Sequence, residues 1–293
     1  MKPPPFEYHR PTSIEDACRL LAMLENAKVL AGGQSLMAML NLRYLYPDHL
    51  VDINKVPGLD GIIVGDDRLS IGAQARQRHM EIDPDIARVA PIFAEALALV
   101  GHRQTRNRGT LGGSLCHLDP AAELPLVALV YDAVVRTAKA GGAKRTIPID
   151  TFIAGFMQPA IDPDELVVGI DFPAWPAGHG YSFMERARRH GDFAVASAAC
   201  LMATDPDGRI ERVAIGVGGL GPVPVRLTAA EQALLGTSGG EDSFALAASH
   251  CEGIEAITDF HGHAAYRRGV GTALVRRALA TAYERARHME MAQ

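Results

Sequence analysis

Two short glycine-rich segments carry the residue types best suited to hold a phosphate group. The first consists of Ala31, Gly32, Gly33, Gln34, Ser35 and Leu36. The second contains Thr110, Gly112, Gly113 and Ser114 and repeats the Gly-Gly-polar-Leu pattern. Consecutive glycines allow a left-handed turn in which successive N–H groups point into one concavity, and a following helix adds a partial positive charge. The first segment alone is better interpreted as a plain turn, whereas two converging loops suit a diphosphate held from both sides.

A third glycine segment, Gly216–Gly221, matches the GxGxxG pattern of dinucleotide-binding folds and follows an expected strand. That motif works only where a helix begins at its end and offers free N–H groups to a pyrophosphate. Pro222 and Pro224 follow at once, and proline removes N–H donors and favours an extended chain. We therefore interpret this segment as a turn at the end of a strand.

The other reactive side chains form no recognisable catalytic or metal site. The four cysteines are scattered without a CxxC pair, which gives little support for zinc or iron–sulfur ligation. Cys116 stands beside the second loop and is expected to be a buried, inert thiol. His261 and His263 lack a third ligand, so the segment that begins at Asp259 is expected to be a structural turn.

The first loop is expected to join a strand to a helix. Thr12 or Ser13, followed by acidic residues, gives an N-cap signal for a helix. The expected elements of this part are a helix at 14–25, a strand at 28–31, a helix at 36–44 capped by Ser35, and a strand at 49–53.

The second loop follows a segment rich in Arg, Asn, Thr and Gly, residues 102–115, in which regular structure is not expected. A Gly-Asp-Asp-Arg turn predicts a hairpin before it, and Pro125 is placed in the first turn of a helix after it. The expected elements are strands at 62–64 and 69–72, helices at 91–100 and 121–130, and strands at 134–138, 145–149 and 166–172.

Residues 173–178 are dense in proline and glycine and mark the best domain boundary. Beyond it we expect strands at 181–186, 195–204 and 212–217 and a last helix at 266–288. Arg267 and Arg268 stand at the wrong end of that helix for its dipole, so they are interpreted as facing a partner.

Composition indicates an ordinary globular protein. The chain has 293 residues, 48% of them hydrophobic and 22% charged, and its net charge is -5, which gives no electrostatic reason to expect nucleic acid. The first residues lack the apolar core of a signal peptide, and the most apolar stretch, 124–135, is too short to span a bilayer. We therefore expect a cytoplasmic protein with no transmembrane segment.

The motifs AGGQSL at 31–36 and RNRGTLGGSL at 106–115 resemble those of the FAD-binding medium subunits of molybdenum hydroxylases. Residues 106–125 are most similar to subunits of heteroaromatic hydroxylases, while the layout is shared with carbon monoxide and xanthine dehydrogenases. The resemblance covers essentially the whole chain. It implies an α+β protein with a PCMH-type (vanillyl-alcohol-oxidase-like) FAD-binding fold. This fold would comprise two α/β subdomains at 1–57 and 58–176 and a C-terminal flavoprotein domain with a small antiparallel sheet at 177–293.

The resemblance also assigns roles to single residues. Ala31 to Leu36 would contact the FAD pyrophosphate mainly through backbone N–H groups, and Thr110 to Ser114 would contact it from the other side. Asp119 and Glu123 match acidic positions near the sugar or ring edge of the flavin. Phe193 stands where relatives often have a tyrosine beside the isoalloxazine, although a core aromatic is nearly as good an interpretation. His102 and His117 flank the second loop, but this family generally binds its flavin without a covalent bond.

The implied function is electron transfer. A large subunit with a molybdopterin cofactor would hydroxylate the substrate, and a small subunit with two [2Fe–2S] clusters would pass electrons to the FAD of this chain and on to an external acceptor. The expected assembly is a dimer of heterotrimers. An N-heteroaromatic substrate is favoured, and a carbon monoxide dehydrogenase subunit or a stand-alone flavin oxidase is the alternative. An interaction scaffold that has lost FAD is disfavoured because both loops are intact.

Overall fold

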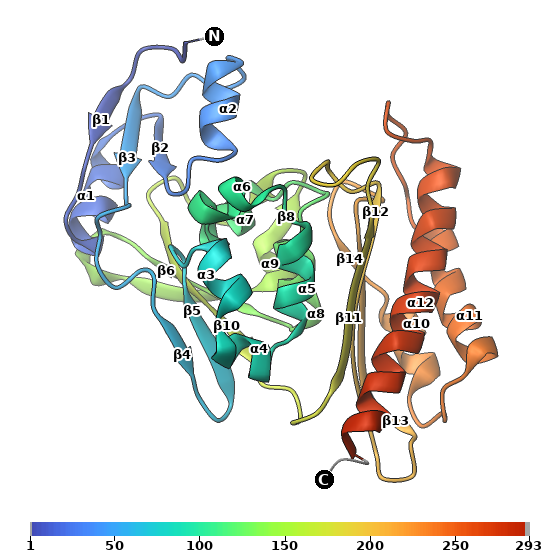
Figure 1. The fold of residues 1–293 in the computed structure, drawn as a ribbon. Coiled ribbons are helices and arrows are strands. Elements are labelled where there is room, and N and C mark those ends of the chain that lie inside the picture. The colour runs from blue at the N-terminus through green and yellow to red at the C-terminus, as the bar shows by residue number, and fades with distance from the viewer. Residues whose placement is uncertain (1, 291–293) are drawn as a thin grey trace.

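The computed structural model describes residues 2–290, with side chains up to Arg287. Three sheets of at least three strands follow one another along the chain, and the long helix near its C-terminus lies on the outer side of the third (Figure 1). The expected α+β class is confirmed by this arrangement. Between residues 2 and 290, no helix combines the length and the apolar character that a bilayer crossing requires.

The first sheet is small and parallel. Its strand order is β1-β3-β2, from β1 (Glu7–His9), β3 (His49–Asp52) and β2 (Ala27–Leu30). The N-cap prediction for helix α1 (Ile14–Met23) is confirmed, because the Ser13 hydroxyl accepts a hydrogen bond from the N–H of Asp16. Helix α2 (Leu36–Asn41) is shorter than expected and ends before Tyr44.

The second sheet is antiparallel and has the strand order β4-β5-β10-β6-β7. The predicted hairpin is confirmed as β4 (Ile62–Val64) and β5 (Arg68–Gly72). The remaining strands are β6 (Val134–Ala138), β7 (Lys144–Pro148) and β10 (Leu166–Pro173). A separate short pair follows β7, formed by β8 (Ile153–Gly155) and β9 (Gln158–Pro159).

Helices fill the space between the second and third sheets. They are α3 (Gln77–Ile82), α4 (Pro84–Val89), α5 (Ile92–Leu99), α6 (Arg103–Arg108), α7 (Leu111–His117), α8 (Glu123–Val130) and α9 (Ile149–Phe152). The expectation of irregular structure at 102–115 is wrong, because this segment forms α6 and α7. Arg106 is buried and binds Glu81 through two hydrogen bonds, and the Thr110 hydroxyl caps α7. These side chains stabilise helices that composition alone does not predict.

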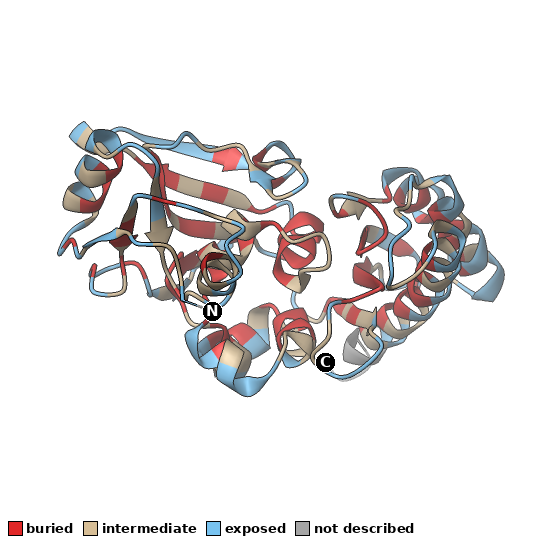
Figure 2. Ribbon diagram, turned by 90° about the horizontal axis from the view of Figure 1, so that it is seen from above, coloured by how far each residue is buried: buried red, intermediate tan, exposed pale blue. Residues whose placement is uncertain are grey.

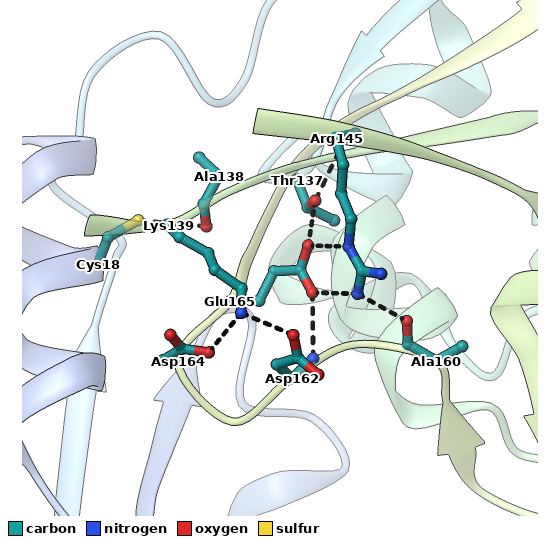
Figure 3. A network of polar contacts seen from close by, with 9 residues as sticks. All are labelled: Cys18, Thr137, Ala138, Lys139, Arg145, Ala160, Asp162, Asp164 and Glu165. Carbon is teal, nitrogen blue, oxygen red and sulfur yellow. Dashed lines mark hydrogen bonds and ion pairs between the residues drawn. The ribbon is translucent and has the colours of Figure 1, made fainter. Parts of the chain in front are cut away.

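A buried carboxylate joins strands of the second sheet (Figure 3). Glu165 accepts hydrogen bonds from Arg145 and Thr137 and from the N–H of Asp162 at 3.1 Å. Burial alone would raise the pKa of Glu165, but these hydrogen bonds lower it to about 2. Beside this network, the Cys18 thiol of α1 lies 3.5 Å from the carbonyl oxygen of Ala138, so α1 contacts the second sheet at β6.

The third sheet is antiparallel, with the order β11-β12-β13-β14. Its strands are β11 (Gly180–Arg186), β12 (Ala196–Thr204), β13 (Ile210–Gly218) and β14 (Val225–Arg226), and its helices are α10 (Thr228–Leu234), α11 (Glu241–Ser249) and α12 (Ala264–Glu290). Helix α12 covers one face, while α5 and α8 face the other (Figure 1). Buried residues accordingly concentrate where the layers face each other (Figure 2).

The GxGxxG-like segment is a packing feature. It lies at the end of β13, and the chain bends after it without starting a helix there, which confirms the interpretation as a turn. A Cβ atom added to Gly216 would lie 2.7 Å from the Leu126 side chain and 2.8 Å from that of Val130. The glycine therefore allows α8 to approach the sheet closely.

The expectation that Arg267 faces a partner is wrong. This side chain is only 3% exposed and donates hydrogen bonds to the carbonyl oxygens of Val195 and Gly219 and to Asp259. Asp259 in turn accepts from the N–H groups of His261 and Gly262, so the predicted structural turn is confirmed. The arginine thus fixes the start of α12 against the third sheet.

Candidate functional site

The two glycine loops lie against each other although they are far apart in the sequence. A Cβ atom added to Gly32 would lie 2.2 Å from the carbonyl oxygen of Arg108 and 2.9 Å from the Cα atom of Gly109. A Cβ atom added to Gly113 would lie 3.8 Å from the Cβ of Ala31. Only glycine allows such close backbone contact at Gly32. The predicted convergence of the loops is therefore present.

The first loop presents a row of free backbone donors. Gly33 adopts a left-handed conformation with φ of 74°, which turns the chain between β2 and α2. Among the described residues, no acceptor is found for the five consecutive N–H groups from Gly32 to Leu36. The expected cap from the Ser35 side chain is absent, so its hydroxyl is also free. Such a row of N–H groups at a helix start is a binding site for an anion.

The second loop offers different groups. Four consecutive N–H groups of this loop are already paired: Leu111 donates to Ala75, Gly112 to Ala73, Gly113 to the Thr110 hydroxyl, and Ser114 to the Thr110 carbonyl. The expectation of the same backbone chemistry in both loops therefore holds only for the first. Thr110 is only 2% exposed and its hydroxyl caps α7, so the second loop can contribute mainly the hydroxyl of the half-buried Ser114 and a surface without side chains at its glycines.

Two residues that the sequence analysis did not single out connect the loops. The Asn54 side-chain amide donates to the carbonyl oxygen of Ala31 at 2.8 Å, and its oxygen accepts from the Arg76 guanidinium at 2.6 Å. The same guanidinium donates to the carbonyl oxygen of Arg108, next to the second loop. We call Asn54 and Arg76 the loop clamp. The only sign of this clamp in the sequence was Asn54, a polar residue two positions after the strand that ends at Asp52.

The two acidic residues lie just after the second loop, where α7 ends and α8 begins. Asp119 accepts a hydrogen bond from the N–H of Ala121 at 2.9 Å, so one of its oxygens already stabilises the turn. Burial and the nearby Glu185 carboxylate raise the pKa of Glu123 to about 8. A carboxyl group with this pKa is mostly protonated at neutral pH, and in that form Glu123 can donate a hydrogen bond as well as accept one.

Phe193 lies on the loop between β11 and β12, and its side chain is 63% exposed. This exposure argues against the alternative of a core aromatic. The loop contacts His102, the residue before α6, because the rings of His190 and His102 are 5.7 Å apart and Gly191 packs on His102. The segment that carries Phe193 is thus held beside the helix that leads into the second loop.

The remaining reactive groups near the loops are not activated. Cys116 is half-buried rather than buried as expected, and burial raises the pKa of its thiol to about 12, which agrees with the expectation that the thiol is inert. Burial also lowers the pKa of His117. The loop N–H groups, two hydroxyls and a neutral carboxylic acid fit a dinucleotide diphosphate with an adjoining polar ring system, and none of these groups is a nucleophile with a base.

Two protein-family models match the sequence of the chain. Residues 4–175 match the FAD binding domain in molybdopterin dehydrogenase, and residues 181–282 match the CO dehydrogenase flavoprotein C-terminal domain. The chain therefore belongs to the family of FAD-binding medium subunits of molybdenum hydroxylases, and its own cofactor is FAD. It is a flavoprotein component of an oxidoreductase.

Known proteins resemble the chain over nearly its whole length. The 6-hydroxypseudooxynicotine dehydrogenase complex subunit alpha of Paenarthrobacter nicotinovorans is 43% identical, over 98% of this chain and 97% of the relative. The structure of carbon monoxide dehydrogenase from Hydrogenophaga pseudoflava matches with a TM-score of 0.94 and 36% identity, over 97% of this chain and 99% of that one. Quinoline 2-oxidoreductase from Pseudomonas putida 86 matches with a TM-score of 0.93 and 33% identity, over 98% and 99%.

Proposed function

We propose that the chain is the electron-transfer subunit of its complex and holds FAD at the two loops. The observation that carries the proposal is the row of free N–H groups from Gly32 to Leu36, which lies against the hydroxyl-bearing second loop. A bound flavin accepts two electrons and passes them on. In this proposal the loops bind the pyrophosphate, while Asp119, Glu123 and Phe193 lie along the sugar and ring.

The partners are part of the same proposal. The thiols of Cys18, Cys200 and Cys251 are buried, and burial raises the pKa of each, which is unfavourable for ligating a cluster as thiolates. The [2Fe–2S] clusters are therefore assigned to a small partner subunit and the molybdopterin cofactor to a large one. We propose that two such heterotrimers form a dimer in the cytoplasm. Within this chain we propose three domains, at 1–57, 58–176 and 177–293.

An N-heteroaromatic compound is the proposed class of substrate. Support comes from the relatives whose names refer to a hydroxypseudooxynicotine and to quinoline. The structural likeness to a carbon monoxide dehydrogenase supports carbon monoxide as the second candidate. The two are distinguished by adding quinoline or carbon monoxide to the purified complex and following the loss of the visible flavin band. Bleaching of the isolated chain by quinoline would instead favour a stand-alone flavin oxidase.

Substitution of the loop glycines tests the FAD site. In Gly33→Asp and Gly113→Asp a carboxylate lies against the pyrophosphate, so we expect complexes that assemble but contain little FAD. Gly33→Asn is the matched control, because asparagine has the same shape and tolerates the left-handed conformation without the charge. Normal FAD content in both aspartate variants would contradict the assignment of the loops.

A further inference from the structure

A second group of ligand-type side chains lies on the first sheet, away from the two loops. In the parallel pairing of β1 with β3, Glu7 stands opposite His49 and His9 stands opposite Val51. Because side chains alternate along a strand, Glu7 and His9 face the same side, and both reach His49 on the neighbouring strand. In the described part of the chain this is the only cluster of three such residues whose ligand atoms all lie within 4.8 Å of one another.

The distances within the cluster match those between ligands of one small cation. His9 Nε2 and His49 Nδ1 are 3.1 Å apart, and Glu7 Oε2 lies 3.5 Å from His49 Nδ1 and 3.9 Å from His9 Nε2. Tetrahedral zinc with bonds of about 2.0–2.1 Å separates its ligand atoms by about 3.3 Å. A small closing movement of Glu7, whose side chain is 74% exposed, would bring all three atoms to that spacing.

The chemistry of the donors selects the kind of ion. Two imidazole nitrogens and one carboxylate oxygen suit divalent zinc, cobalt, nickel or copper, whereas calcium and magnesium prefer oxygen ligands alone. Both histidine side chains are half-buried, so each ring is restricted to few orientations and is already close to the other. The exposed side of the cluster leaves the fourth ligand position open to water.

We propose that Glu7, His9 and His49 form a binding site for a divalent transition-metal ion. The ion would connect β1, an edge strand of three residues, to β3, the central strand of the sheet. It would therefore stabilise the attachment of the N-terminal strand. The proposal is independent of the FAD site, because none of the three residues belongs to either glycine loop or to the loop clamp.

The alternative explanation of the same geometry is a hydrogen bond between the two imidazoles, with one proton between them. The test is isothermal titration calorimetry, in which Zn²⁺ is added to the full-length, untagged chain after a chelator has removed bound metal and has itself been removed. We expect one Zn²⁺ per chain and an increase of the melting temperature on binding. No binding of Zn²⁺ would overturn the proposal in favour of the hydrogen-bonded pair.

Variants show where the ion binds. Removing a residue that only hydrogen-bonds a metal ligand typically weakens metal binding by about 10–100-fold. His9→Gln and His49→Gln remove a ligand itself, so they should weaken Zn²⁺ binding by at least about tenfold. Glu7→Gln should also weaken it, and this exposed residue can be changed without disturbing the core. His79→Gln is the matched control, since His79 lies 3.7 Å from Asp83 but has no second imidazole beside it. Unchanged Zn²⁺ affinity in the three cluster variants would overturn the proposal.

Discussion

The loop clamp makes a quantitative prediction for FAD binding. Arg76→Met keeps most of the aliphatic stem of the side chain but removes the donors to Asn54 and to the Arg108 carbonyl. A hydrogen bond from a charged group contributes about 1.5–3 kcal/mol, and water will replace part of it because Arg76 is half-buried. We therefore expect the variant to lose about 2 kcal/mol of the free energy that holds the loops together, equivalent to roughly 30-fold weaker FAD binding.

The assay is titration of the flavin-free chain with FAD, followed by the change in flavin fluorescence. Arg68→Met is the control, because Arg68 is an exposed arginine of β5 that, among the described residues, pairs only with its neighbour Asp67 in the hairpin turn. Asn54→Ala should weaken FAD binding as well, and the double variant should lose less than the sum of the single losses. The reasoning is refuted if Arg76→Met lowers the melting temperature but the folded variant binds FAD like the unchanged chain.

Substitutions at Gly32, Glu123 and Glu165 have distinct expected effects. Gly32→Ala forces a Cβ atom to within 2.2 Å of a backbone carbonyl, so FAD binding should be lost, whereas Gly61→Ala, with open space around it, should bind normally. Glu123 has its pKa raised to about 8, so the stability it contributes as a neutral group is lost as the pH rises from about 4.5 towards 8, by up to about 1.4 kcal/mol per pH unit. Glu123→Gln should therefore be more stable than the unchanged chain in urea at pH 8 but not at pH 4.5, and an equal difference at both would contradict this. Glu165 has its pKa lowered to about 2, so the destabilisation by Glu165→Gln should be largest near pH 7 and should shrink as the pH falls from about 4.5 towards 2. Denaturation at several pH values measures this trend.

The sequence allowed the order of elements to be predicted best where local rules decide it. The hairpin at β4 and β5, the Ser13 cap and the long final helix all follow from turn chemistry, capping and apolar spacing. Helices α6 and α7 were missed because tertiary hydrogen bonds, such as that of Arg106 with Glu81, stabilise a segment of poor helix composition.

The site was predictable only in part for the same reason. The glycines of both loops are visible in the sequence, because close backbone contact and left-handed turns require them. The loop clamp is not visible, since Asn54 and Arg76 acquire their role only when two distant segments meet. Likewise, the sequence does not reveal that Arg267 is buried and donates its hydrogen bonds to carbonyl oxygens inside the fold.

Because helices cover both faces of the third sheet, this sheet cannot be fully buried until the helices have been synthesised. Every residue from Ala196 to Ala203 in β12 is buried, partly under α12, which is synthesised after all strands of this sheet. Until α12 has been synthesised, the outer face of this sheet presents uncovered apolar side chains to solvent. We expect chains truncated before Ala264 to aggregate during expression, and chains that include α12 to depend on its rapid docking onto this sheet.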